Sequence, residues 1–273
     1  MRPLALACAA AVLLLAAPAG AQEADQTVVN LSTTRPLKLH GSYFRLTHRF
    51  ARDLGRGDLG DLSQDLFGLD NGAIIGLEYR FGLTRTIQAG IHRSILGKTI
   101  VAFGRWDVVR QENFPVSVSV SPGYEGQNNL RQDHQPSIAV TVSRTAGKAL
   151  ALYASPTFVH NAHTETLREL HEGHQHDEIQ EIADHSDAID TTFIGLGARL
   201  KVRPTAYVVG EVSPRIAGYR PDRANWNVGV EKETHGHVLQ LNFGNNFNTT
   251  PGQIARGGAP SQVFMGFNIS RRF

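Results

Sequence analysis

A two-residue alternation of apolar and polar side chains recurs along most of this 273-residue chain, and no other feature constrains its fold as strongly. In residues 114–121 (FPVSVSVS), for example, three valines alternate with three serines. This period places the two kinds of side chain on opposite faces of a β-strand. About twelve segments of roughly ten residues show it, which is the length of a tilted membrane-spanning strand. The expected strands are 37–49, 72–81, 84–94, 98–110, 114–124, 136–146, 150–160, 191–202, 204–213, 225–233, 235–246 and 261–273.

The connections between these segments alternate in length. The short connections are 82–83, 111–113, 147–149, 203 and 234, and the long ones are 50–71, 125–135, 161–190, 214–224 and 247–260. One further short connection, 95–97, falls on the long-loop side. Short turns at one rim and long loops at the other are typical of outer-membrane barrels. The pattern therefore predicts an all-β, antiparallel, up-and-down transmembrane β-barrel of about twelve strands, with its long loops outside and both termini on the periplasmic rim.

A soluble β-protein would show the same alternation, so the position of the charges decides between the two. The polar face carries charged or titratable groups in mid-strand, which an aqueous lumen accepts and the packed interior of a large soluble barrel would not. These residues are Glu78, Arg80, His92, Arg105, Asp107, Arg199, Lys201 and Glu211. On the apolar face, Arg93, Arg110 and Arg271 fall near strand ends, where an arginine costs little, compared with about 2–4 kcal/mol at the bilayer midplane. Both observations favour lipid on the apolar face.

The N-terminus carries a secretion signal rather than part of the fold. Arg2 precedes a short apolar run, and Ala19-Gly20-Ala21 forms a cleavage site, so residues 1–21 are expected to be a signal peptide. The only cysteine, Cys8, lies within it, and the mature chain is expected to have no disulfide. We expect an N-terminal segment at 22–36 and one barrel domain at 37–273. A formal net charge of +2 without a dense basic stretch argues against nucleic acid as a partner.

The last strand ends on an aromatic residue. Phe273, Ile269, Phe267 and Met265 share one face, and this strand resembles the C-terminal signature of Gram-negative outer-membrane proteins. The resemblance implies the barrel-assembly machinery as a partner. The apolar strand faces and the signal peptide predict outer-membrane localisation and contact with outer-membrane lipid. Arg271 departs from the pattern, which usually has an apolar or aromatic residue there.

The body of the chain resembles an uncharacterised bacterial β-barrel family, a domain of unknown function. The residues that carry this resemblance are 44–53 (FRLTHRFARD), 66–82 (LFGLDNGAIIGLEYRFG) and 86–94 (TIQAGIHRS). The family has no established activity, so the resemblance implies no catalytic residue.

The outer loop at 161–190 is rich in histidine and acidic residues. His171, His174, His176 and Asp177 could bind Zn, Cu or Ni, since imidazole and carboxylate suit these ions. The alternative is a hydrated acidic loop without a metal, because no ligand spacing of a known site occurs there.

The charges expected in the lumen leave two functions open. They could set the selectivity of a porin-like pore that passes or holds small hydrophilic solutes. Alternatively, they could form paired networks that plug the barrel, which would then serve as a structural or interaction protein docking a periplasmic or surface partner. About twelve strands give a width at which either is feasible. A third hypothesis, an outer-membrane hydrolase, has least support because no catalytic motif is visible, and we expect no enzyme activity.

Overall fold

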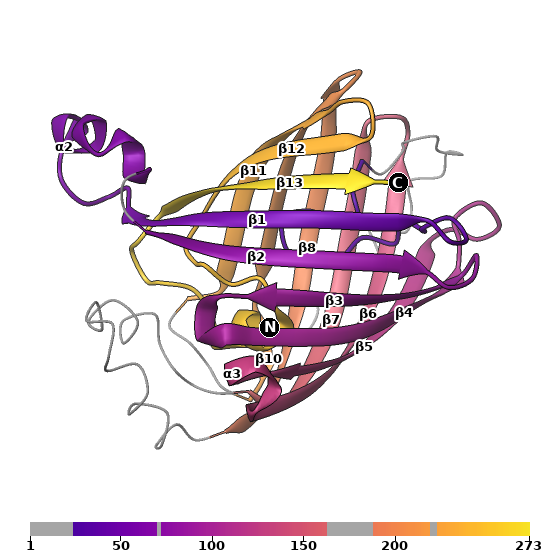
Figure 1. The fold of residues 1–273 in the computed structure, drawn as a ribbon. Coiled ribbons are helices and arrows are strands. Elements are labelled where there is room, and N and C mark those ends of the chain that lie inside the picture. Colours follow the sequence, from indigo (N-terminus) through magenta and orange to yellow (C-terminus); the bar gives the residue numbers. More distant parts are fainter. Residues whose placement is uncertain (1–23, 70–71, 163–187, 219–222) are drawn as a thin grey trace, which may run out of the picture.

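A computed structural model of the protein describes residues 24–69, 72–162, 188–218 and 223–273 (Figure 1). Its strands are β1 Ser42–Asp53, β2 Ala73–Gly82, β3 Ile87–Ser94, β4 Thr99–Val109, β5 Ser117–Gly126, β6 Gln132–Ala146, β7 Leu150–Ala162, β8 Ile189–Arg203, β9 Ala206–Ser213, β10 Arg215–Ala217, β11 Asn225–Glu233, β12 His237–Gly244 and β13 Phe264–Arg272. The helical turns are α2 Leu59–Gln64, η1 Leu66–Gly68, η2 Leu96–Lys98, α3 Gln127–Leu130 and α5 Pro251–Arg256. The expected signal peptide, residues 1–21, lies outside the described residues.

The strands form one closed antiparallel barrel. Apart from the short strand β10, successive strands pair with one another along the chain, and the N-terminal strand β1 closes the sheet against the C-terminal strand β13. β10 is a three-residue continuation of β9 beyond Pro214 that also pairs with β8. The other twelve strands therefore make the wall, and the predicted fold class is confirmed.

Short turns and longer loops occupy opposite rims, as the sequence predicts (Figure 1). The short-turn rim carries 83–86, 110–116, 147–149, 204–205 and 234–236, together with the C-terminus at the right of Figure 1. The long-loop rim carries α2, at the left of the picture, and the connection 245–263 between β12 and β13.

Several predicted boundaries differ from the structure by a few residues, and two of the differences have a clear physical reason. The first strand begins at Ser42 rather than residue 37, because His40 has a positive φ of 58° and its N–H binds the carbonyl of Gly82, which turns the chain at the rim. The predicted long loop at 125–135 is mostly strand, since β5 and β6 extend to a tight turn at 127–131. Three consecutive residues with positive φ, Asn128 to Leu130, make that turn tight.

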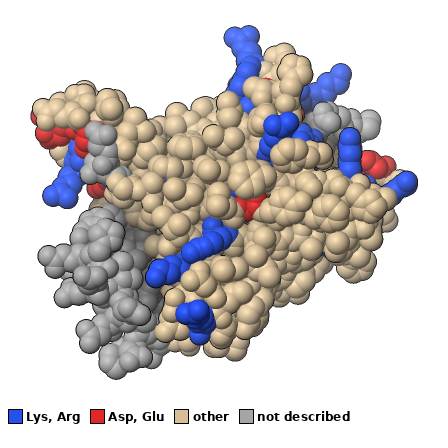
Figure 2. All heavy atoms as spheres, viewed as in Figure 1, with Lys and Arg blue, Asp and Glu red and all other residues tan. Residues whose placement is uncertain are grey.

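The outer face of the barrel is apolar. Its exposed side chains include Leu77, Ile91, Leu241 and Ile269 from four different strands. Aromatic side chains such as Tyr79, Trp106, Phe158 and Phe273 are also exposed. On the face seen in Figure 2, uncharged side chains cover most of the strands, and most charged atoms lie toward the two ends. Among the described residues, no helix is long and apolar enough to cross a membrane.

The inner face is polar, and two segments of the chain fold into the space it encloses. Residues 24–35, which precede β1, enter from the short-turn rim, and residues 245–260 fold inward from the long-loop rim. Almost every side chain of the first segment is buried, from Ala24 to Thr34. Residues 24–35 of the expected N-terminal segment are therefore part of the folded interior.

Candidate functional site

The N-terminal segment forms a narrow turn inside the barrel. The Val28 N–H binds the carbonyl of Leu31 over 2.8 Å, and the Thr33 N–H binds the carbonyl of Gln26 over 2.9 Å. At the tip of this turn, Val28, Val29 and Leu31 pack on an apolar patch of the wall formed by Ala151, Tyr153 and Val209. We call residues 24–35 the inner turn.

The wall has room for the tip because β8 carries two glycines opposite it. A Cβ atom at Gly195 would lie 2.5 Å from Leu31 Cδ1, and one at Gly197 would lie 2.8 Å from Leu31 Cδ2. Two non-bonded carbon atoms cannot lie this close together, so a side chain at either position would displace Leu31. The two glycines therefore let Leu31 lie against β8.

A carboxylate of the wall binds the tip of the inner turn. Glu211 accepts hydrogen bonds from three consecutive backbone N–H groups, those of Val29, Asn30 and Leu31, over 2.9–3.0 Å. Its Oε1 also accepts from Asn227 Nδ2 over 3.0 Å. Hydrogen bonds to a charged acceptor are stronger than neutral ones, and this carboxylate satisfies donors that would otherwise be left unpaired at the turn.

Arginines of the wall bind the carbonyl groups of the same turn. Arg45 Nη1 donates to Val29 O over 2.8 Å and to Thr27 Oγ1 over 2.9 Å, while Arg199 Nη2 donates to Thr27 O over 2.6 Å. Arg199 is itself paired with Glu231 over 2.8 Å. Further wall side chains that bind the inner turn are Gln240, Asn268, Arg105 and Ser270. The inner turn is thus fixed from several sides of the barrel.

The inward-folded loop 245–260 narrows the other half of the lumen. Thr250 caps α5, and its hydroxyl donates to Glu125 Oε1 over 2.6 Å, while the Gly252 N–H donates to Glu125 Oε2 over 2.9 Å. Phe247 packs on Phe264 and Leu96, which holds the start of the loop against the wall.

A cavity of about 110 Å³ lies between the inner turn and this loop. Its lining includes Asn30 and Leu31 of the inner turn, Thr249 and Ile254 of the loop, and Arg80 and Phe103 of the wall. We call it the central cavity.

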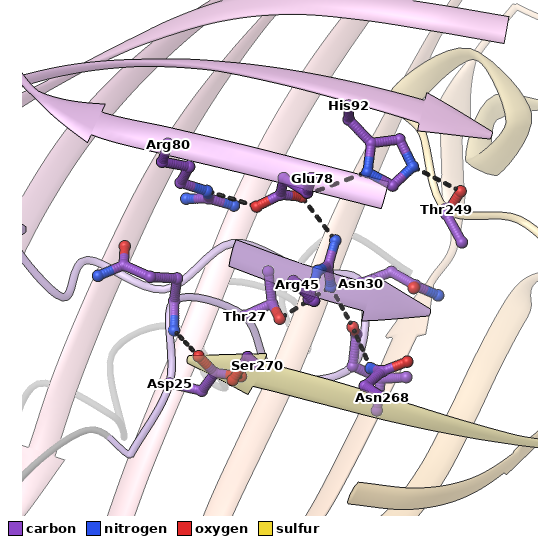
Figure 3. A network of polar contacts seen from close by, with 12 residues as sticks. Asp25, Thr27, Asn30, Arg45, Glu78, Arg80, His92, Thr249, Asn268 and Ser270 are labelled. Atoms are coloured by element: carbon purple, nitrogen blue, oxygen red, sulfur yellow. Dashed lines mark hydrogen bonds and ion pairs between the residues drawn. The ribbon is translucent and has the colours of Figure 1, made fainter. Parts of the chain in front are cut away.

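The charged groups at the central cavity are gathered around one carboxylate (Figure 3). Glu78 Oε2 lies 2.7 Å from Arg45 Nη2, and Glu78 Oε1 lies 2.5 Å from Arg80 Nε. His92 Nδ1 is 3.5 Å from Glu78 Oε2, and its Nε2 is 3.0 Å from Thr249 Oγ1. Through Arg45 and His92, this network connects the inner turn to the inward-folded loop (Figure 3).

The eight residues predicted to face the lumen do lie on the inner side of the strands. Glu78, Arg80, His92 and Arg105 line the central cavity, and Asp107 pairs with Arg105 over 2.8 Å. The remaining three residues do not line the central cavity. Arg199 and Glu211 bind the inner turn, and Lys201 lies nearer the short-turn rim, 5.8 Å from the centre of the Tyr207 ring. The role of all eight residues in solute selectivity stays a prediction.

Several important residues were missed by the sequence analysis, although a signal for some was present. Arg45 and Arg49 alternate with Phe44, Leu46 and His48, so the same period places both arginines on the inner face. The part played by the inner turn has no such signal, because its contacts to the wall run largely through backbone atoms.

The predicted metal ligands His171, His174, His176 and Asp177 lie outside the described residues. At the base of their loop, His160 Nδ1 and Asp190 Oδ1 are 2.7 Å apart, and both side chains are about half exposed. Among the residues that the structure describes, no group of three or more His, Cys, Asp or Glu side chains could hold a metal ion.

The fold and its interior define a β-barrel whose apolar outer face suits a membrane and whose lumen is occupied by parts of its own chain. The chain belongs to the family described as "Membrane bound beta barrel domain (DUF5777)", which matches residues 24–273. The predicted family resemblance is thereby confirmed. No curated protein matches the chain.

Solved structures of outer-membrane barrels are similar to this chain in outline. The NanC porin is 8% identical to this chain, with a TM-score of 0.48, and the match covers 84% of this chain and 97% of the NanC chain. An outer membrane channel from Pseudomonas putida F1 is 10% identical, also with a TM-score of 0.48, and the match covers 87% of this chain and 97% of the channel. Outer membrane phospholipase A from Escherichia coli is 10% identical, with a TM-score of 0.41, and the match covers 86% of this chain and 93% of the phospholipase. Scores this low carry no inference about function.

Proposed function

We propose that this protein is a gated, porin-like barrel of the outer membrane that passes or holds small hydrophilic solutes. The observation that carries the proposal is the inner turn, a segment held across a lumen lined with charged groups by hydrogen bonds and packing. On this proposal the inner turn closes the barrel, and solutes cross only after the inner turn has moved.

The composition of the interior supports a gate rather than a permanent core. Arg45, Arg199 and Glu211 lie on the inner face of the wall. When the inner turn withdraws, these charged side chains would therefore contact water rather than lipid. The inner turn is also adjacent to the short-turn rim, which faces the periplasm in our proposed orientation. A periplasmic partner could reach the chain just before β1 from that side.

Solute flux in proteoliposomes tests the proposal. The mature chain is compared with a variant lacking residues 24–35, in which Gln22 and Glu23 still follow the expected cleavage site. We expect slow release of a trapped small sugar from vesicles with the intact chain and fast release with the variant. Heat-modifiable migration of both proteins in detergent gels verifies that each barrel is folded. A folded variant that releases nothing refutes the pore.

A second candidate is a permanently closed barrel that serves as a structural or docking protein. The number of wall groups that bind the inner turn favours it, since Arg45, Arg199, Glu211 and Gln240 all contribute. This candidate predicts no flux from the shortened variant and stoichiometric copurification with a periplasmic or surface protein.

For the outer loop we propose an additional role, the capture of Zn, Cu or Ni by His171, His174, His176 and Asp177. Imidazole and carboxylate groups suit these ions. Assembly through the terminal residues Phe273, Ile269, Phe267 and Met265 by the barrel-assembly machinery is likewise a proposal.

A further inference from the structure

The side chain of Arg80 is held in the wall of the central cavity with most of its donors unused. Its Nε binds Glu78 Oε1 over 2.5 Å. Within the described part of the chain, neither of its terminal nitrogens has a hydrogen-bond partner, although the side chain is only 2% exposed. The terminal nitrogens are not enclosed by protein atoms and Arg80 lines the central cavity, so an acceptor in the cavity can reach them.

Two aromatic rings fix the direction of this guanidinium. The Arg80 Cζ atom lies 5.1 Å from the centre of the Phe103 ring and 5.6 Å from the centre of the Tyr43 ring. Phe103 can lie there because its strand neighbour is Gly90, where a Cβ atom would be 2.4 Å from Phe103 Cζ. The guanidinium is therefore preorganised before any solute arrives.

The charge balance around Arg80 favours an anion. Arg45 and Arg80 share one carboxylate, Glu78, and among the described residues Arg80 has no second carboxylate within ion-pair distance. Arg105, the other arginine that lines the cavity, is balanced by Asp107 at 2.8 Å. An anion of charge −1 at the terminal nitrogens of Arg80 would give this guanidinium an ion-pair partner that Arg45 does not share.

The rest of the cavity lining suits a small organic group. Ser121 and Ser137 offer hydroxyls, while Val101, Pro122 and Ile254 offer apolar surface. An apolar cavity of about 150 Å³ accommodates benzene, so a volume of about 110 Å³ suits a ligand of about four to six non-hydrogen atoms.

We propose that the central cavity is a binding site for a short-chain carboxylate, whose two oxygens accept hydrogen bonds from the two terminal nitrogens of Arg80. This planar, two-point geometry is the one that a guanidinium offers a carboxylate. Arg45 and Glu78 position Arg80, and the serine hydroxyls and apolar residues surround the carbon chain of the ligand. The inference deepens the proposed function, since it names the class of solute that the lumen holds.

Isothermal titration of the purified full mature protein with propionate tests this site. We expect propionate to bind and the neutral isostere propionamide not to bind, which requires no variant. R80Q should weaken propionate binding at least tenfold. R80K keeps the charge without the two-point geometry, and its affinity for propionate should lie between those of the wild type and R80Q. The control R85Q removes the same charge from an exposed position in the 83–86 turn and should bind like the wild type. Phosphate and chloride, titrated in parallel, should bind more weakly than propionate.

Equal affinity for propionate and propionamide, unchanged affinity in a folded R80Q variant, or tighter binding of phosphate or chloride would each overturn the proposal. These results are separable from the flux experiment. Flux through the chain lacking residues 24–35, combined with binding that is independent of Arg80, would reject the carboxylate site and retain the pore. Arg80-dependent binding without any flux would retain the site and reject the pore.

Discussion

Replacing Glu211 by glutamine should loosen the inner turn, and the only other hydrogen bond of this carboxylate among the described residues is the one from Asn227 Nδ2. The substitution keeps the size of the side chain and takes away its charge. It acts at one position of the wall, where the carboxylate accepts from the N–H groups of Val29, Asn30 and Leu31.

The expected size of the effect follows from these three bonds. A hydrogen bond to a charged group contributes about 1.5–3 kcal/mol, and a neutral one contributes about 1 kcal/mol. Loss of the charge should therefore cost about 1 kcal/mol for each bond, or about 3 kcal/mol together. Since 1.4 kcal/mol corresponds to a factor of ten, the population with the inner turn withdrawn should rise roughly a hundredfold.

Thiol labelling measures this population directly. Because the only cysteine is Cys8 in the expected signal peptide, V28C introduces a single thiol into the mature chain. Val28 is fully buried against the wall, so a water-soluble maleimide should react only after the inner turn has withdrawn. When opening and closing are faster than the reaction, the labelling rate is proportional to the open population.

The matched control is E125Q in the same V28C background. Glu125 is also buried and also binds a backbone N–H, but that of Gly252 in the opposite, inward-folded loop. We expect labelling about a hundred times faster in E211Q than in the parent, and an unchanged rate in E125Q. A rate in E211Q within twofold of the parent would show that this carboxylate does not hold the inner turn.

Four further outcomes are expected. R199Q leaves Glu231 buried without its partner at 2.8 Å and should destabilise the barrel by about 3 kcal/mol, seen as a lower temperature of heat-modifiable unfolding; R199Q/E231Q should recover part of that loss. L241R places a charge on the exposed lipid-facing side in the middle of β12 and should cost about 2–4 kcal/mol in refolding into lipid vesicles, whereas L83R at the short-turn rim should cost about 1 kcal/mol or less. Deletion of Phe273 should reduce the amount of folded barrel in the outer membrane relative to a conservative F273Y variant, and equal amounts would contradict the assembly role. A variant with His171, His174 and His176 changed to alanine should take up less Zn²⁺ in a titration than the wild type, and equal uptake would end the metal proposal.

The barrel wall could be predicted from the sequence because its signal is local. In a strand such as β12, Leu239 and Leu241 face outward and Gln240 and Asn242 face inward, and this order can be read from four consecutive residues. The same rule places Glu78 and Arg80 on the inner face. Short turns such as 147–149 then fix which strands are neighbours.

The filling of the lumen could not be predicted in this way, because it depends on contacts between residues far apart in the chain. Glu211 binds backbone N–H groups of Val29 and Leu31, which any residues other than proline would supply. The sequence of the inner turn has neither a strand period nor a helix period that would assign it to the interior. The terminal nitrogens of Arg80, which have no hydrogen-bond partner among residues 24–69, 72–162, 188–218 and 223–273, likewise cannot be recognised before the neighbouring residues have been placed.

Single-channel recording in planar lipid bilayers tests the central claim most directly, since it measures whether the inner turn closes an aqueous lumen. With the full mature chain we predict long closed periods with rare openings. With the chain lacking residues 24–35 we predict steady, ohmic conductance steps at the same protein concentration. Equal conductance from the two proteins, whether both are open or both are silent, would contradict the account.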